Sequence, residues 1–249
     1  MNKYLTILNS RTVLAVAISG FVSWLTLARN FQYNFDLTMI SIAIIFPLVF
    51  TIRSAFRRRE KALEYLSRFK AGLITVDAIF QESKKIDPEK KLEIGVITKN
   101  IALYLGEYLG TESASPDKVN EETGKVAKFL QANQENIGNS TSYKIHRFMK
   151  DVYQGLENVI AVKHHRTPIS IRAYCLIFIY LYPVIYTPSL YNRLHDGISS
   201  NDSWIVYTLS MFSTFILISL YNVQEQLENP FDQHGVDDIR LDDFKLNVK

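Results

Sequence analysis

The chain has 249 residues, 47% of them hydrophobic, and a formal net charge of only +3. So small an excess of positive charge, with no basic stripe along the sequence, argues against a nucleic-acid partner. The single cysteine, Cys175, excludes an intrachain disulfide bond and any metal site built from cysteines.

The apolar residues are concentrated in four blocks that contain no Asp, Glu, Lys or Arg. One such block alone would equally fit a buried helix of a soluble protein. Four of them, with aromatic residues near their ends, are typical of transmembrane helices, so we predict an all-α, multi-pass integral membrane protein with four spans in a lipid bilayer. The blocks are residues 13–27, 37–52, 173–186 and 204–221.

The second block, residues 37–52, is shorter than the roughly 20 residues that usually span a membrane. It also contains Pro47, which removes one hydrogen bond inside the helix. The carbonyl oxygen that loses its donor then needs a partner from neighbouring protein or from water in a cavity. We therefore expect this helix to pack inside a bundle or to line a pore, and an ordinary kinked anchor helix stays open as the alternative.

Basic residues flank the second and third blocks on the side of the long middle section. By the positive-inside rule this section faces the cytoplasm, and four spans then place both termini there too, in the cell (inner) membrane. The connecting loops, 28–36 and 187–203, hold one arginine each and are expected outside. The flanking cations are Arg53, Arg57, Arg58, Arg59 and Lys61 after the second block, and Lys163, Arg166 and Arg172 before the third.

The middle section has helical periodicity throughout and no sustained alternation that would indicate a strand. Turn and cap residues divide it into helices. We expect four regions: 1–55 with the first two spans, 56–168 as a cytoplasmic helical region, 169–222 with the last two spans, and 223–249 as a C-terminal acidic motif and tail. The expected helices of the middle section run from 56 to about 83, from 88 to about 110, from Ser115-Pro116-Asp117 to a break at 131–139, and from a cap at Ser140 or Ser142 to Thr167-Pro168.

Motifs that carry enzyme chemistry are missing from the sequence: there is no phosphate-binding glycine loop, no HExxH and no GxSxG. The adjacent His164 and His165 suggest a metal site, but neighbours on a helix point about 100° apart and do not easily share one ion. A cationic helix end is the simpler interpretation. We therefore expect no catalytic residue, no metal site, no cofactor and no enzymatic function.

The sequence after the fourth block resembles the signature of bestrophins. It reads Gln226-Leu227-Glu228-Asn229-Pro230-Phe231, followed by Asp237-Asp238-Ile239. In bestrophins an Asn-Pro-Phe or Asp-Pro-Phe step likewise precedes an acidic cluster after the last span. The layout of two helices, a long cytoplasmic section and two further helices also agrees. Further matches are Phe50-x-x-Arg53-x-Ala55 running into Arg57-Arg58-Arg59-Glu60, Thr167-Pro168 before the third span, and Tyr180-x-x-Pro183 within it.

One departure is that Arg58 and Arg59 stand where the family commonly has a pair of tryptophans. The resemblance implies a divergent bacterial member: a homopentameric channel whose second helices surround a central pore. Its partners would be small inorganic ions, in the first place chloride and other anions. A cation-selective bestrophin homologue and a non-conducting membrane scaffold or sensor stay open as alternatives.

Within the second span, Ile42, Phe46 and Phe50 are spaced four apart and so lie on one helical face. They match the rows of apolar side chains that form the pore neck in bestrophins. Such a ring can block conduction by dewetting. If Pro47 rather than the arginines anchors the comparison, the neck consists of Phe46, Phe50 and Ser54. Without the resemblance, this face would be interpreted as packed against lipid or another helix.

The resemblance also implies a second, cytoplasmic constriction. Bestrophins place a small apolar ring beside the proline that precedes the third span. Ile169 follows Pro168 and occupies that position, with Ile171 as the alternative. We expect Ile169 to restrict the passage of large ions more than that of small ones.

Animal bestrophins bind calcium with a clasp built on the acidic stretch. Here Asp238 matches the last acid of the clasp, but its spacing from Asn229 is one residue longer, and His234-Gly235 fall where an earlier acid would be. Calcium needs about six or seven oxygen ligands from a well-formed loop. We therefore predict no high-affinity calcium activation, and a motif that ties the helix end to a neighbouring subunit. The motif residues are Gln226, Asn229, Pro230, Phe231, Asp237 and Asp238.

Overall fold

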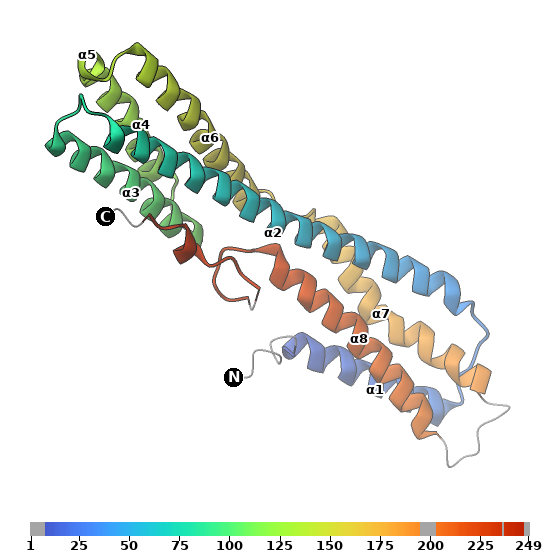
Figure 1. Cartoon of the computed structure of the whole chain (residues 1–249). Helices are drawn as coiled ribbons and strands as arrows, with labels where there is room; N and C mark the ends of the chain where they lie inside the picture. Colours follow the sequence, from blue (N-terminus) through green and yellow to red (C-terminus); the bar gives the residue numbers. More distant parts are fainter. Residues whose placement is uncertain (1–7, 195–202, 236, 247–249) are drawn as a thin grey trace. The chain divides into compact units, whose positions relative to one another are not determined.

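The computed structural model describes residues 8–194, 203–235 and 237–246 and contains helices and no strand within these ranges (Figure 1). The prediction of an all-α fold is confirmed. Four stretches are long and apolar enough to cross a membrane, as expected for an integral membrane protein. They are Ser10–Arg29, Leu37–Glu82, Asn139–Leu194 and Trp204–Glu228.

The chain divides into two compact units. Unit 1 consists of Met1–Arg57 and Thr167–Glu228, and unit 2 consists of Arg58–Arg166 and Asn229–Lys249. Helix α2 (Leu37–Glu82) is one continuous helix that contributes residues to both units and joins the predicted second span to the helix predicted from residue 56.

Unit 1 is built from α1 (Ser10–Arg29), the first part of α2, α7 (Ile169–Leu194) and α8 (Trp204–Glu228). Helices α1, α7 and α8 pack against one another (Figure 1). The side chain of Asn9 caps α1 by accepting the N–H of Thr12 at 3.0 Å. A local polar contact of this kind fixes where the first span begins.

Helix α7 is longer than predicted, so the expected loop over 187–203 is wrong in its first half. The helix continues to Leu194 although it contains Pro183 and Pro188. Pro188 removes the donor for the carbonyl oxygen of Val184. The hydroxyl of Tyr33 lies 3.3 Å from that oxygen and 3.0 Å from the carbonyl oxygen of Ile185, so a side chain from another segment supports α7 beyond the predicted end of the span at residue 186.

Unit 2 contains the rest of α2, α3 (Pro88–Gly110), α4 (Asp117–Ala132), α5 (Gln134–Ile137), α6 (Asn139–His164) and the 3-10 turn η3 (Leu241–Phe244). Large apolar side chains form its core, among them Phe69 and Phe80 of α2 and Ile94 of α3. Helices α2 and α6 approach closely at two glycines. A Cβ atom on Gly155 would lie 2.9 Å from the carbonyl oxygen of Tyr65, and one on Gly72 would lie 2.8 Å from Val152.

Two details of the middle section differ from the prediction. The break at 131–139 contains the short helix α5, and α6 begins at Asn139 instead of after a cap at Ser140 or Ser142. Gly138 holds the N-cap position with φ of 74°, a conformation that glycine adopts readily. A glycine thus sets the helix start, where the sequence pattern favoured a serine.

Candidate functional site

The first part of α2 presents an apolar stripe on one face. Ile42, Phe46 and Phe50 are 50%, 56% and 61% exposed within the chain, and the ring centroids of the two phenylalanines are 6.1 Å apart. Ile44 and Leu48, on the opposite face, are buried in the core of unit 1. Ser54 of the alternative register is also exposed, so both proposed registers lie on the free side of α2.

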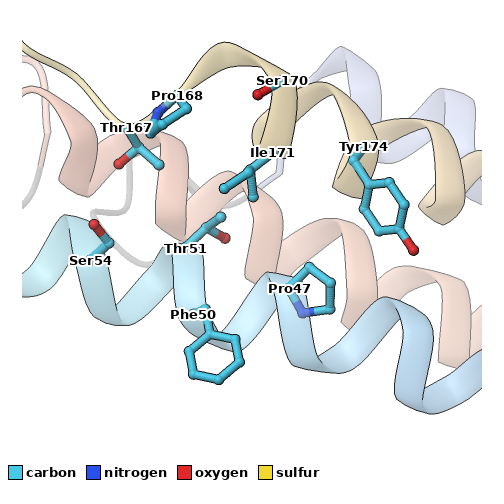
Figure 2. A pocket seen from close by; sticks show the side chains of 9 residues that line it. All are labelled: Pro47, Phe50, Thr51, Ser54, Thr167, Pro168, Ser170, Ile171 and Tyr174. Carbon is cyan, nitrogen blue, oxygen red and sulfur yellow. The ribbon is translucent and has the colours of Figure 1, made fainter.

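Beside this stripe lies a cavity of about 670 Å³ between α2 and the start of α7. Figure 2 shows Phe50 and Ser54 reaching it from α2, and Ile171 and Tyr174 from α7. Its lining is mostly apolar and contains no charged side chain, while five residues bring hydroxyl groups. The lining residues are Pro47, Phe50, Thr51, Ser54, Thr167, Pro168, Ser170, Ile171 and Tyr174.

Pro47 does not interrupt α2, and the structure shows how its missing hydrogen bond is replaced. The carbonyl oxygen of Ala43, four residues earlier, would bond the amide that proline lacks. The hydroxyl of Tyr174 on α7 donates to this oxygen at 3.3 Å. The expectation that neighbouring protein would supply the partner is therefore met. The sequence did not predict that Tyr174 is this partner, because Tyr174 and Ala43 are 131 positions apart and no sequence pattern connects them.

The residue of the predicted cytoplasmic constriction lies at the beginning of α7. Ile169 is 80% exposed, and Ile171, the alternative, is exposed as well and lines the cavity. Two residues before Ile169, Thr167 is only 8% exposed, and its N–H donates to the carboxylate of Glu228 at 2.5 Å. An exposed apolar side chain thus follows directly after an anchored segment.

The C-terminal motif residues are divided between the two units. Gln226 belongs to α8 in unit 1. Phe231 is fully buried in the core of unit 2, next in sequence to Pro230, whose carbonyl oxygen accepts the N–H of Ile239 at 2.9 Å. From Asn229 onward the motif is therefore a structural part of unit 2.

The acidic end of the motif forms a tight turn. Asn229 donates to Asp232 at 2.9 Å, and Asp238 accepts the N–H of Gly235 at 2.9 Å. Burial, and a hydrogen bond that protonated Asp238 donates to the carboxylate of Asp232, raise the pKa of Asp238 to about 6. Among the described residues no group of three or more His, Cys, Asp or Glu side chains is placed to hold a metal ion. The turn is built from hydrogen bonds between its own residues.

The two arginines that replace the tryptophan pair both bind backbone oxygens within unit 2. Arg58 donates to the carbonyl oxygens of Val162 and His165 at the end of α6. A cation is favourable at this negative end of a helix. Arg59 donates to the carbonyl oxygen of Asp237, at 2.5 Å. The departure from the family pattern therefore has a local structural role.

His164, one of the two adjacent histidines, contacts a tyrosine of α3. His164 Nε2 lies 2.8 Å from the hydroxyl of Tyr108, whose pKa is raised by burial. Lys163 Nζ lies 4.1 Å from the centre of the Tyr108 ring, as in a cation–π contact. These residues join α3 to the end of α6, a contact that no sequence motif indicated.

The chain matches no protein-family model and no curated protein. Its fold does match solved structures. A mutant of a bacterial bestrophin homologue from Klebsiella pneumoniae has a TM-score of 0.81 and 14% identity, covering 94% of this chain and 93% of that one. Another crystal structure of a bestrophin homologue from that organism has a TM-score of 0.76 and 15% identity, with the same coverage. A crystal structure described as a membrane protein has a TM-score of 0.75 and 15% identity, again over 94% and 93%.

This likeness covers nearly the whole of both chains and confirms the bestrophin resemblance at the level of the fold. At 14% to 15% identity it carries no residue roles across. The chain thus has a bestrophin-like fold, with four stretches that are long and apolar enough to cross a membrane.

Proposed function

We propose that this protein is an ion channel of the bestrophin type, in which five copies of the chain place their α2 helices around a central pore. The observation that carries the proposal is the apolar stripe of Ile42, Phe46 and Phe50, which is free on a helix whose opposite face is buried. A stripe of this kind would also be stable against lipid. The bestrophin-like fold over 94% of the chain favours the pore.

The proposed neck works by excluding water. A ring of apolar side chains in a narrow pore lets water and ions pass only when it widens, because a dry constriction presents a large barrier to an ion. The positive edges of the phenylalanine rings can assist a passing anion. We propose chloride and other small anions as the permeating ions, and a cation-selective channel is the competing outcome of the test.

The cavity that Phe50 lines together with the start of α7 fits the proposed passage of ions. The hydroxyl groups of Ser54, Thr167 and Ser170 can replace part of an ion's hydration shell, and the lack of charged side chains in the lining keeps binding weak enough for an ion to leave. Ile169, which is exposed at the start of α7, would form the second constriction. We further propose that the channel works without high-affinity calcium activation.

The basic flanks support an orientation in the cell (inner) membrane with unit 2 and both termini in the cytoplasm. Two glycosylation acceptor sequences, at Asn139 and Asn201, allow a test in a glycosylating membrane system. Asn201 lies outside the described residues, while Asn139 is the first residue of α6. Asn139 should stay unmodified, and its modification would overturn the orientation.

The decisive experiment uses purified protein in planar bilayers. The parent should give unitary currents, and Phe46→Ala combined with Phe50→Ala should raise conductance or open probability because the dewetting barrier falls. Ile42→Ala and Ser54→Ala separate the two neck registers, since each changes the current in one register only. Reversal potentials under a salt gradient distinguish anion from cation selectivity.

Mass measurement of the intact complex reports the proposed pentamer independently of conduction. A parent that forms pentamers but passes no current would favour the membrane scaffold or sensor. A double variant that assembles and conducts as the parent does would remove α2 from the pore.

A further inference from the structure

Glu228 is the last residue of α8, and its carboxylate is buried. The residue is only 2% exposed. A buried carboxylate is costly unless hydrogen-bond donors compensate for the lost water. Glu228 stands directly before Asn229-Pro230-Phe231, within the stretch that resembles the bestrophin signature. It is not one of the motif residues for which the sequence predicted a role.

Two donors from unit 1 face the carboxylate. Oε1 accepts a hydrogen bond from the main-chain N–H of Thr167 at 2.5 Å, and Oε2 accepts one from Nε2 of Gln224 at 3.1 Å. The first bond joins residues 61 positions apart and links the end of α8 to the segment just before α7. Hydrogen bonds to an ionised acceptor are short and roughly twice as strong as neutral ones.

The link between Thr167 and Ile169 is stiff. Only Pro168 stands between them, and its ring fixes φ near −65°. Because Pro168 has no N–H, the nearest main-chain donor before the start of α7 is the amide of Thr167. Exposure changes from 8% at Thr167 to 80% at Ile169, so an anchored residue and a free one are separated by one rigid residue. Holding Thr167 in place therefore fixes the direction in which Ile169 projects.

We propose that Glu228 is a positioning residue for the cytoplasmic constriction: its carboxylate holds Thr167, and through Pro168 it sets where Ile169 projects. This inference rests on the proposed channel function and names a residue on which the width of the constriction depends. The C-terminal motif thereby acts on the pore from within the same subunit.

Three substitutions separate the hydrogen bond from packing and charge. Glu228→Gln keeps an oxygen that can accept the N–H of Thr167. Glu228→Met keeps the volume but removes the acceptor, and Glu228→Asp keeps the charge on a side chain one methylene shorter. Ile169→Ala serves as the reference for a widened ring.

The first measurement does not depend on conduction. Hydrogen exchange of a peptide that contains the Thr167 amide should speed up about tenfold in Glu228→Met, because a bond to a charged group is lost. Glu228→Asp should change in the same direction, while Glu228→Gln should stay within about threefold of the parent. Equal exchange in all four proteins would show that Glu228 does not hold Thr167 and would overturn the inference.

The second measurement is the permeability of a large ion relative to a small one in bilayers. Glu228→Met and Glu228→Asp should shift this ratio by about twofold or more, as Ile169→Ala does, and should add little to Ile169→Ala in the double variant. Glu228→Gln should behave as the parent. If Glu228→Met does not assemble, the comparison of Glu228→Asp with Glu228→Gln carries the test.

The outcomes distinguish this inference from the proposed function. If the parent conducts and all assembled Glu228 variants keep its permeability ratio, the positioning role is wrong and the channel stands. If the parent passes no ions under any condition, the channel and the constriction are both wrong, and the exchange experiment still decides whether Glu228 fixes Thr167.

Discussion

Units 1 and 2 are both helical and both have an apolar core, but unit 1 adds buried hydroxyl contacts between its helices. In unit 1 the contacts between helices use hydroxyl groups: Ser210 of α8 lies 2.9 Å from the hydroxyl of Ser19 and 2.5 Å from that of Thr187. Large apolar side chains such as Phe21 and Trp24 are exposed there. In unit 2 large apolar residues fill the core, and Phe80 packs edge-on against Phe129 with ring centroids 5.4 Å apart.

The difference follows from the two solvents. Between helices in lipid there is no hydrophobic driving force, so close packing of small residues and hydrogen bonds between helices decide the contacts. A bundle in water is stabilised mainly by removing apolar surface from the solvent. The core of unit 2 therefore consists of large buried apolar residues. In unit 1 the buried positions of α1 are small or hydroxyl-bearing: Thr12, Ala15, Ser19, Ser23 and Thr26.

The largest expected effect comes from opening the core of unit 2. Phe80→Ala removes a fully buried ring and should lower the free energy of unfolding of unit 2 by about 3–5 kcal/mol. Denaturant-dependent hydrogen exchange of α3 and α4 measures it. Phe21→Ala deletes the same ring from the exposed face of α1 and should change stability by less than about 0.5 kcal/mol. Similar losses in both variants would contradict the comparison.

A smaller effect is expected from the hydroxyl contacts of unit 1. Ser210→Ala removes the shared partner of Ser19 and Thr187 and should cost about 1–2 kcal/mol, since hydrogen bonds between membrane helices contribute about 0.6 kcal/mol on average and up to about 1.7. Thermal unfolding in detergent, followed by the exchange of α1, α7 and α8, measures the loss. An unchanged Ser210→Ala protein would mean that packing alone joins these helices.

The pair of Pro47 and Tyr174 should give an effect of about 1 kcal/mol, the usual net contribution of one hydrogen bond. Tyr174→Phe leaves the carbonyl oxygen of Ala43 without its donor. In a Pro47→Ala background residue 47 regains an N–H for that oxygen, so Tyr174→Phe should become nearly neutral. A double-mutant cycle on stability measures the coupling, and additive losses would show that the hydroxyl does not serve the proline.

The last expected effect is a pH dependence of the C-terminal turn. The pKa of Asp238 is about 6 in the folded chain, above its usual 3.8, so the folded turn binds a proton more readily than the unfolded chain does. Stability should therefore be highest below pH 3.8 with respect to this group and should fall as the pH rises toward 6. Asp238→Asn should flatten this part of the pH profile of unit 2, with the parent at matched pH as the control. A slope that persists in Asp238→Asn would assign it to other groups.

The sequence predicted the elements that repeat a local pattern and missed contacts between distant residues. Blocks without charge identified the spans, and helical periodicity identified α3. The predicted end of the third span at residue 186 was wrong, because α7 continues to Leu194 with support from Tyr33 on another segment. No local pattern could have shown it.

The candidate site was likewise predicted only where a local sequence pattern indicates it. The neck stripe was predicted from the four-residue spacing on one face of α2, and its exposure agrees with a free face while the pore itself stays a prediction. The bond between Glu228 and Thr167 was not predicted, because in the sequence a buried acid looks like any other acid near a helix end. Replacement of the tryptophans by Arg58 and Arg59 appeared as a gap in the resemblance, and only the backbone oxygens that they bind explain it.

The close approach of α2 and α6 constrains how this sequence can evolve. A methyl group at Gly72 would meet a side-chain atom of Val152 at 2.8 Å and main-chain atoms of Phe148 and Val152 at 3.3 Å, so a smaller residue at 152 together with a small shift of the helices could compensate for it. A methyl group at Gly155 would meet the main-chain oxygen of Tyr65 at 2.9 Å and Cβ of Phe69 at 2.8 Å, and no ordinary side-chain exchange removes a backbone atom. In relatives that keep this helix pair, positions 72 and 152 should therefore covary, while position 155 should remain glycine.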